Sequence, residues 1–265
     1  MTATATNPLT TDPDPRQVAR VPLSRLCRVE LRKSWDTRAG LWLLIGIGVI
    51  TAAIVVIFLL VADARDTTWD NFLGATTLPQ NILLPVLGVL LVTSEWSQRT
   101  GLVTFTLEPN RSRIAVAKVV ATLVLAFAAV LLALAVSALA TALAAVFFDA
   151  GGIWNLSGGD FGDIVVAQLM AVLQGVAFGM LIMNSAAAIV ALFALPLAWT
   201  ILVNLVTALH DLRDWLDLQT TNIALFEHTM DAEAWAKLGV SVAVWVLLPL
   251  VLGTIRLLRR EVKSA

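Results

Sequence analysis

The sequence has one cysteine, no tyrosine and two histidines, and charged residues make up only 14% of its 265 positions. The single cysteine, Cys27, cannot form an internal disulfide, which excludes a secreted disulfide scaffold. Soluble domains average about 25% charged residues. Here 58% of the residues are hydrophobic and the mean hydropathy is +0.85, so the composition predicts a protein of the lipid bilayer.

The chain also lacks the motifs that several kinds of chemistry require. The chain has no GxxxxGK[ST] phosphate-binding loop, no GxSxG motif and no HExxH or HxxxH spacing. His210 and His228 have acidic neighbours (Asp211, Asp214, Glu227 and Asp231), but without metal-site spacing we interpret them as solvated loop residues and predict no metal. No ionisable residue lies near the middle of a predicted span, which argues against a proton-coupled carrier. We therefore predict that the chain is not an enzyme, binds no cofactor itself, and receives any energy for transport from outside.

Long uncharged runs are the main positive signal. A membrane core about 30 Å thick needs about 20 helical residues per crossing. Six segments meet this requirement, which predicts an all-α polytopic membrane protein with spans near 41–62, 72–93, 114–148, 164–183, 186–209 and 238–255. In the fourth span, Gly175 and Gly179 form a small-xxx-small pair that permits close helix contact, and Gln168 and Gln174 are polar groups at membrane depth.

Basic residues are sorted between the two sides of these spans. Of the 18 lysines and arginines, seven precede the first span, four lie between the second and third, and four follow the last, leaving three for the other side. The positive-inside rule then places both termini in the cytoplasm. The net charge of −1 and this sorting argue against a nucleic-acid partner.

The segments outside the spans differ from one another. Residues 1–22 predict a disordered cytoplasmic tail, and 256–265 a basic one. Residues 23–38 predict an amphipathic interfacial helix. Its apolar face holds Leu23, Leu26, Cys27, Leu31 and Trp35, and its charged face holds Arg25, Arg28, Arg32, Lys33 and Asp36. Glu30 and Ser34 interrupt the apolar stripe, which suggests contact with protein there. The alternative is a simple positively charged topology anchor.

Two connections are too long for plain turns. In 94–113, Leu102, Phe105 and Thr106 can share one face of a short helix that Pro109 ends, although a solvated loop is the alternative. The outer loop 210–237 holds many large apolar residues, which predicts short helices dipping into the outer leaflet.

Together these residues resemble the ABC-2 type permeases, the membrane subunits of ABC exporters. The resemblance rests on an acidic residue ending the second span, a turn, a leucine-rich short helix, a Pro-containing turn with arginines, and a lysine entering the third span. The matching residues are Glu95, Arg99, Thr100, Gly101, Leu102, Phe105, Leu107, Pro109, Arg111, Arg113 and Lys118. Thr100-Gly101 reverses the usual Gly-Thr order. The family's elbow helix is matched by Arg28, Glu30, Leu31, Arg32, Lys33 and Trp35.

This resemblance implies a coupling helix, inserted into a cleft of a separate cytoplasmic ABC ATPase that carries the ATP and Mg²⁺. Leu102, Phe105 and Leu107 would be its apolar contacts, and Glu95, Arg99, Arg111 and Arg113 its polar clamps. A second permease copy, identical or paralogous, would complete the pathway in a bacterial inner membrane. Two other readings remain: a non-transporting membrane anchor or sensor, and an intramembrane enzyme acting on lipids. Few polar groups in the spans suggest an apolar or amphipathic cargo.

Overall fold

The computed structural model describes residues 21–63, 65–97, 104, 106–147, 153–155 and 157–259. The chain is built from helices, which run in the order α1 (Leu23–Asp36), α2 (Arg38–Val61), α3 (Trp69–Ser97), α5 (Arg111–Phe147), α6 (Gly158–Ile182), α7 (Ser185–Leu205), the 3₁₀ turn η2 (Thr207–Leu209), α8 (His210–Leu216), α9 (Leu218–Phe226), α10 (Ala232–Val242), the π-helical turn η3 (Ala243–Leu247) and α11 (Leu248–Arg259).

Six helices within the described residues are long and apolar enough to cross a membrane, as expected for a multi-pass protein, and the described chain is helical as predicted. They are α2, α3, α5, α6, α7 and the continuous helix Ala232–Arg259 formed by α10, η3 and α11. All six begin before the predicted starts of the spans, and four of them, α2, α5, α6 and α7, end before the predicted ends. The last helix continues through Arg259, beyond the predicted end at 255, and α7 ends at Leu205 rather than 209.

Local sequence signals set several of these ends. Ser157 caps α6 by accepting from the amide of Asp160 (3.2 Å), whose carboxylate accepts from the amide of Ser157 (2.8 Å). The helix ends at Met183 in the left-handed conformation (φ 56°). Asn184 then caps α7 through the amide of Ala187 (3.0 Å). These caps produce the tight α6–α7 hairpin.

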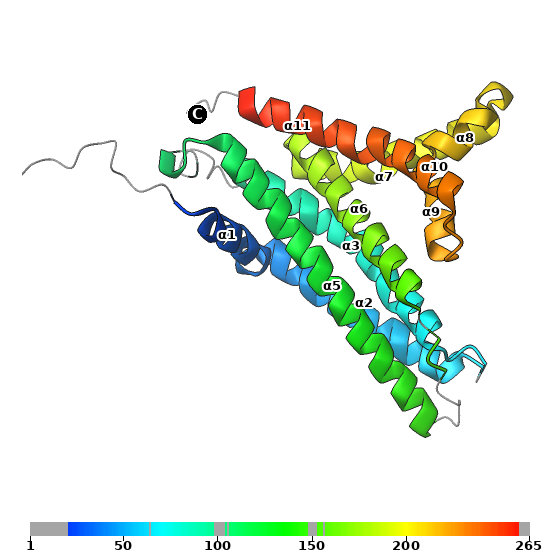
Figure 1. The fold of residues 1–265 in the computed structure, drawn as a ribbon. Coiled ribbons are helices and arrows are strands. Elements are labelled where there is room, and N and C mark those ends of the chain that lie inside the picture. The colour runs from blue at the N-terminus through cyan, green and yellow to red at the C-terminus, as the bar shows by residue number, and fades with distance from the viewer. Residues whose placement is uncertain are drawn as a thin grey trace, which may run out of the picture.

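Helices α3 and α6 form the centre of the bundle, with α2 and α5 on one side and α7 and α11 on the other (Figure 1). A Cβ added to Gly175 would lie 2.0 Å from the carbonyl oxygen of Pro85, and one on Gly179 would lie 3.2 Å from Cα of Val89. The glycine pair therefore allows α3 and α6 to cross backbone against backbone. This confirms the close helix contact that their spacing predicts.

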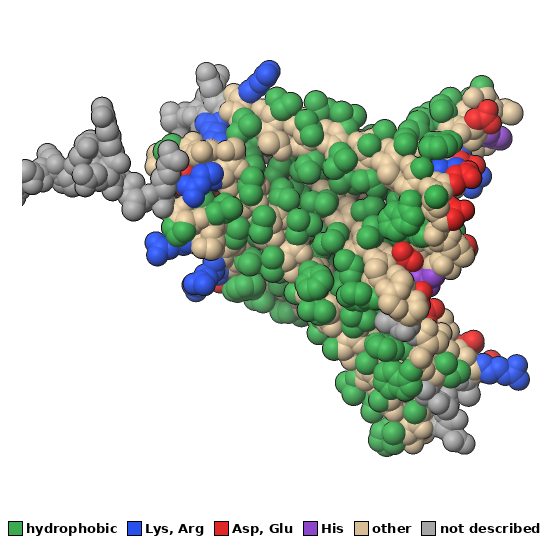
Figure 2. All heavy atoms as spheres, in the orientation of Figure 1, with side chains coloured by type: hydrophobic (Ala, Val, Ile, Leu, Met, Phe, Trp, Pro, Cys, Tyr) green, Lys and Arg blue, Asp and Glu red, His purple; other side chains and the backbone are tan. Residues whose placement is uncertain are grey.

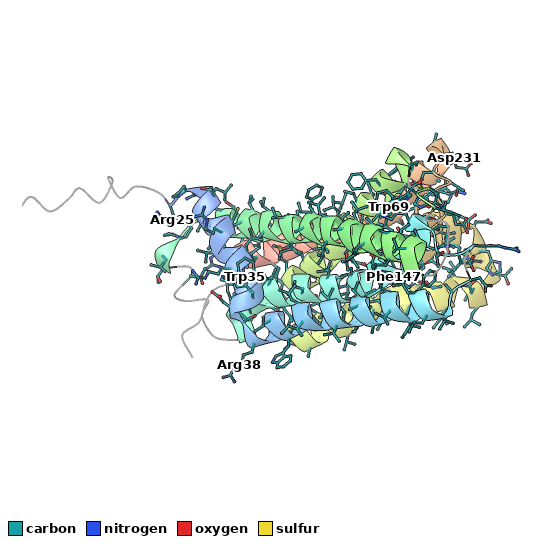
Figure 3. All side chains as sticks on the ribbon, turned by 90° about the horizontal axis from the view of Figure 1, so that it is seen from below. Arg25, Trp35, Arg38, Trp69, Phe147 and Asp231 are labelled. Atoms are coloured by element: carbon teal, nitrogen blue, oxygen red, sulfur yellow. The ribbon has the colours of Figure 1, made fainter. Side chains whose placement is uncertain are left out.

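The two ends of the bundle carry different charges. On the face shown in Figure 2, hydrophobic side chains cover the middle, most lysines and arginines gather at the end with α1, and acidic side chains gather at the end with α8 to α10. Helix α1 lies across the first of these ends, with Arg25, Trp35 and Arg38 far from Phe147 and Asp231 (Figure 3). This is the charge distribution expected of helices that cross a bilayer.

Candidate functional site

Four ionisable side chains meet where α1, α3 and α5 join. The ammonium group of Lys33 lies 2.6 Å from Oε1 of Glu30 and 2.9 Å from Oε1 of Glu95. That of Lys118 lies 2.9 Å from Oε2 of Glu30 and 3.2 Å from Oε1 of Glu95. Each lysine thus contacts both glutamates. We call these four residues the ionic cluster.

The ionic cluster is deeply buried and electrically balanced. The side chains of Lys118, Glu95, Glu30 and Lys33 are 1%, 2%, 7% and 25% exposed. Lys118 also donates to the backbone carbonyl of Leu91 (3.2 Å). Burying charges is costly unless they are paired and hydrogen-bonded. Two cations and two anions meet this condition together, so removing any one leaves an unpaired buried charge.

Helix α1 contributes half of the cluster because its apolar stripe is interrupted. Glu30 and Ser34 are the two buried residues of this helix, whereas apolar Leu23 and Trp35 are 40% and 48% exposed. Helix α1 therefore faces the rest of the protein with the two polar residues that interrupt its apolar stripe. This agrees with the contact that the sequence suggests. Lys33, which helical periodicity groups with the arginines, turns inward instead because two carboxylates lie within its reach.

A sharp turn at Thr37 holds α1 against the bundle. The hydroxyl of Thr37 accepts from the amide of Gly40 (3.1 Å) and caps α2. A Cβ on Gly40 would lie 2.2 Å from the carbonyl oxygen of Ser34, so only glycine fits at this approach. Residues 34–40 thus fix the angle at which α1 meets α2.

The pKa of Lys33, which lies outside the spans, reflects the balance between burial and nearby charges in the cluster. Its burial acts to lower the pKa, but the nearby carboxylates of Glu30 and Glu95 outweigh this and raise the pKa above its ordinary value of 10.5. Lys33 is therefore charged at every physiological pH.

Further polar contacts surround the cluster at the same end of the bundle. Arg113 pairs with Glu108 (2.8 Å) and donates to the carbonyl of Val21, just before α1. Arg111 donates to the carbonyl of Leu257 in α11 (3.3 Å). The two arginines thus tie the start of α5 to the segment just before α1, to Glu108 of the connection and to α11.

The predicted coupling and elbow residues divide into three groups. Glu95 and Lys118 are joined with Glu30 and Lys33 in the ionic cluster, and Arg111 and Arg113 form the contacts around it. Exposed positions are Leu107 (74%), Pro109, Arg28, Arg32 and Trp35, while Leu31 is half-buried. Arg99, Thr100, Gly101, Leu102 and Phe105 lie outside the described residues.

At the opposite end, His228 has neighbours that its sequence position does not suggest. Its ring nitrogens lie 3.4 Å from Asp70, 3.6 Å from Asp160 and 3.4 Å from Asp163, none of which is among the adjacent acids considered from the sequence. These contacts link the α9–α10 turn to the starts of α3 and α6. Within the described ranges, no set of three His, Cys, Asp or Glu residues could hold a metal ion.

Comparisons with known proteins give no match: no family model fits the sequence, and no curated protein resembles it. What the chain does must therefore be inferred from its own residues and geometry.

Proposed function

We propose that the chain is the transmembrane subunit of an ABC exporter of the ABC-2 type, coupled to a separate cytoplasmic ATPase through the connection between α3 and α5. The observation that carries this proposal is the ionic cluster. It joins α1, α3 and α5 at the two anchors of that connection, since Glu95 lies near the end of α3 and Lys118 lies near the start of α5.

The cluster makes the end of the bundle suitable for transmitting force. A connection anchored on flexible helix ends would absorb a push from a partner by bending locally. Here the helix ends are tied to each other by buried charges. At the start of α5, Arg113 binds Glu108 of the connection and the carbonyl of Val21 before α1, and Arg111 binds α11. A displacement of this connection would therefore move α1, α3 and α5 together.

The exposed surface at this end is also suited to a partner. Leu107, just before the connection re-enters the bundle, is 74% exposed although it is apolar. Leu102 and Phe105, outside the described residues, are the other apolar contacts that the resemblance implies. Such side chains would insert into an ATPase cleft, with the basic residues of α1 at the cytoplasmic membrane surface.

In this role the chain supplies the pathway and the partner supplies the energy. ATP and Mg²⁺ would bind the ATPase subunits, whose closure on ATP would favour an outward-releasing arrangement of the spans. A second permease subunit, identical or paralogous, would enclose the pathway. The location would be a bacterial inner membrane with both termini in the cytoplasm.

The test is co-purification of the tagged chain from its native membranes, followed by identification of bound ABC ATPase and measurement of ATP hydrolysis. We expect the double variant Leu102→Asp, Phe105→Asp to lose the ATPase while still inserting into the membrane. The matched control is Leu212→Asp, Trp215→Asp in α8, where both residues are 41% exposed and lie at the other end.

Two results would contradict the proposal. One is wild-type recovery of the ATPase with the double variant, and the other is a properly inserted wild-type chain that never associates with an ABC ATPase. Association with a cytoplasmic partner but no ATP-dependent transport would instead favour the anchor or sensor role.

A further inference from the structure

A cavity of about 340 Å³ lies between α3, α6, α7 and α9. Its size falls at the lower end of the range for small-molecule sites, about 300–1,000 Å³. Apolar residues form most of the wall, including Ile82, Phe193 and Phe226, and none of the described residues that line it is ionisable. The cavity is distinct from the ionic cluster, because no residue of the cluster lines it.

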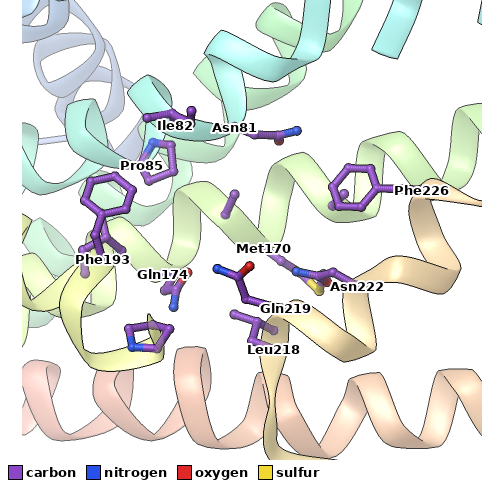
Figure 4. A pocket seen from close by; sticks show the side chains of 14 residues that line it. Asn81, Ile82, Pro85, Met170, Gln174, Phe193, Leu218, Gln219, Asn222 and Phe226 are labelled. Carbon is purple, nitrogen blue, oxygen red and sulfur yellow. The ribbon is translucent and has the colours of Figure 1, made fainter. Parts of the chain in front are cut away.

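Four carboxamides interrupt this apolar wall: Asn81, Gln174, Gln219 and Asn222. Figure 4 shows the side chains of Gln174, Gln219 and Asn222, from α6 and α9, converging on the same space. Two of their polar atoms, Nε2 of Gln174 and Oδ1 of Asn222, are buried and have no hydrogen-bond partner. Gln174 as a whole is only 9% exposed. A buried polar atom without a partner is costly, so these two atoms point to a ligand that would satisfy them.

Two prolines add backbone polarity to the same wall. Proline has no N–H to donate to the carbonyl four residues earlier in a helix. Pro85 thus removes the usual donor of the Asn81 carbonyl in α3, and Pro196 that of the Leu192 carbonyl in α7. All four residues line the cavity, so both carbonyls without their usual helical donor belong to lining residues.

The wall formed by α9 is held in place from three sides. The carboxylate of Asp217 caps α9 and accepts from the hydroxyl of Thr200 in α7 (3.0 Å). Thr221 and Ser241 share a hydrogen bond between α9 and α10 (2.7 Å). Leu225 packs with residues of α6 and α10. Because these contacts are internal to the protein, the cavity is preformed, and a ligand need not order α9 on binding.

We propose that this cavity binds a neutral, amphipathic small molecule that carries a hydrogen-bond donor beside an acceptor, such as a carboxamide. The acceptor would pair with Nε2 of Gln174 and the donor with Oδ1 of Asn222, while the apolar part would lie against Phe193 and Phe226. A charged ligand would find no counter-charge in the wall. A plain hydrocarbon chain would leave both amide atoms unpaired. The binding of such a molecule does not depend on the proposed function. Only its interpretation as cargo rests on that function.

The experiment compares three probes of equal length with the full chain purified in detergent. They are an N-benzyl alkanamide, the corresponding amine, which is cationic at pH 7, and the corresponding alkylbenzene, each with a photoreactive diazirine. We expect the amide to bind at least about tenfold more tightly than the other two, since two buried hydrogen bonds distinguish it. After irradiation, its label should map to the segments that line the cavity, residues 81–85 of α3, 167–174 of α6, 192–196 of α7 and 218–226 of α9.

Leucine substitutions then test the two amide atoms, because leucine is close in size to both side chains but forms no hydrogen bond. Gln174→Leu and Asn222→Leu should each weaken amide binding about three- to tenfold and leave alkylbenzene binding unchanged or tighter. Gln168→Leu is the matched control. Gln168 lies on the same helix, is 1% exposed and also has an unpartnered Nε2, but it does not line the cavity, so amide binding should remain at the wild-type level.

Equal binding of all three probes, tightest binding of the alkylbenzene, or labels outside the cavity-lining segments of α3, α6, α7 and α9 would overturn the proposal. Tightest binding of the alkylbenzene would identify a slot for lipid chains. Because no ATPase is present, a negative result here leaves the proposed coupling intact. Loss of the ATPase in the co-purification test likewise leaves this binding site intact.

Discussion

Replacing Lys118 by methionine tests whether the ionic cluster holds α1 on the bundle. Methionine preserves most of the side-chain volume and removes only the ammonium group. The Lys118 side chain is 1% exposed, and its ammonium group contacts Glu30, Glu95 and the Leu91 carbonyl. The variant retains Lys33 against two glutamates, so one buried negative charge loses its partner. Removal of one member of a buried ion pair costs about 3–5 kcal/mol.

A double-mutant cycle separates the ion pair from other effects of the substitution. Glu30→Gln alone leaves an excess positive charge, whereas Glu30→Gln combined with Lys118→Met leaves Lys33 balanced by Glu95 alone. The double variant should therefore be more stable than the sum of the single losses implies, with a coupling energy of about 1–3 kcal/mol. Arg32→Met, on the same helix as Glu30, is the control. Its pair with Asp36 has the same 2.9 Å separation as the Lys118–Glu30 pair but is exposed, so it contributes at most about 1 kcal/mol.

The sole cysteine provides the assay. Cys27 is half-buried on α1, so a maleimide that reacts faster reports that α1 has left the bundle. A loss of 3 kcal/mol raises the undocked population about 100-fold. Because the half-buried thiol also reacts slowly while α1 is docked, we expect Lys118→Met to label faster than Arg32→Met, by less than that factor. Equal labelling of these two variants, together with additive losses in the cycle, would refute the structural role of the cluster.

Two further predictions concern packing and pH. Gly175→Ala should lower stability by about 1–3 kcal/mol, because its Cβ would lie 2.0 Å from the Pro85 carbonyl oxygen. Gly74→Ala, with nothing within 4 Å of the added Cβ, should be neutral or stabilising. Thermal unfolding followed by tryptophan fluorescence compares the two variants, and equal shifts in midpoint would contradict the close crossing. The raised pKa of Lys33 means that its stabilising effect is fully present below its ordinary pKa of 10.5 and is lost as pH rises through the higher pKa of the folded state. The difference in unfolding midpoint between wild type and Lys33→Met should thus be constant from about pH 7 to 9.5 and shrink only at more alkaline pH, and a decrease near neutral pH would show that Lys33 is not held by the two carboxylates.

The parts of the fold that could be predicted from the sequence follow mostly from hydropathy and from helix-capping residues. Apolar runs of sufficient length place the six long helices, because a helix that must lie in lipid cannot have frequent charges. The boundaries are less well predicted, since charged residues also occur within helix ends. Arg111 and Arg259, for example, belong to α5 and α11 although they are polar. Whether α1 lies in the membrane surface remains a prediction.

The functional features show where sequence patterns stop being informative. Glu30 signals a buried partner because it interrupts an apolar stripe, but nothing local shows that this partner is Lys118, which is 88 residues away. The position of Lys33 on the helix predicts an outward orientation, and tertiary contacts with Glu95 reverse it. Similarly, the ring of His228 contacts Asp70 and Asp163, which belong to other parts of the chain, rather than the acidic residues that are its neighbours in sequence.

The ionic cluster and the amide-lined cavity are connected through α3. Glu95 lies near one end of this helix, and Pro85 lies ten residues earlier, about 15 Å along the axis. At Pro85 the helix both lines the cavity and touches Gly175 of α6 backbone to backbone. No flexible side chain separates the two helices there, so a shift of α3 cannot be absorbed at the contact and must also displace α6. In an exporter of the proposed kind, force applied beside Glu95 would thus alter the spacing of the α3 and α6 walls of the cavity, without a direct contact between the ATPase and the bound molecule.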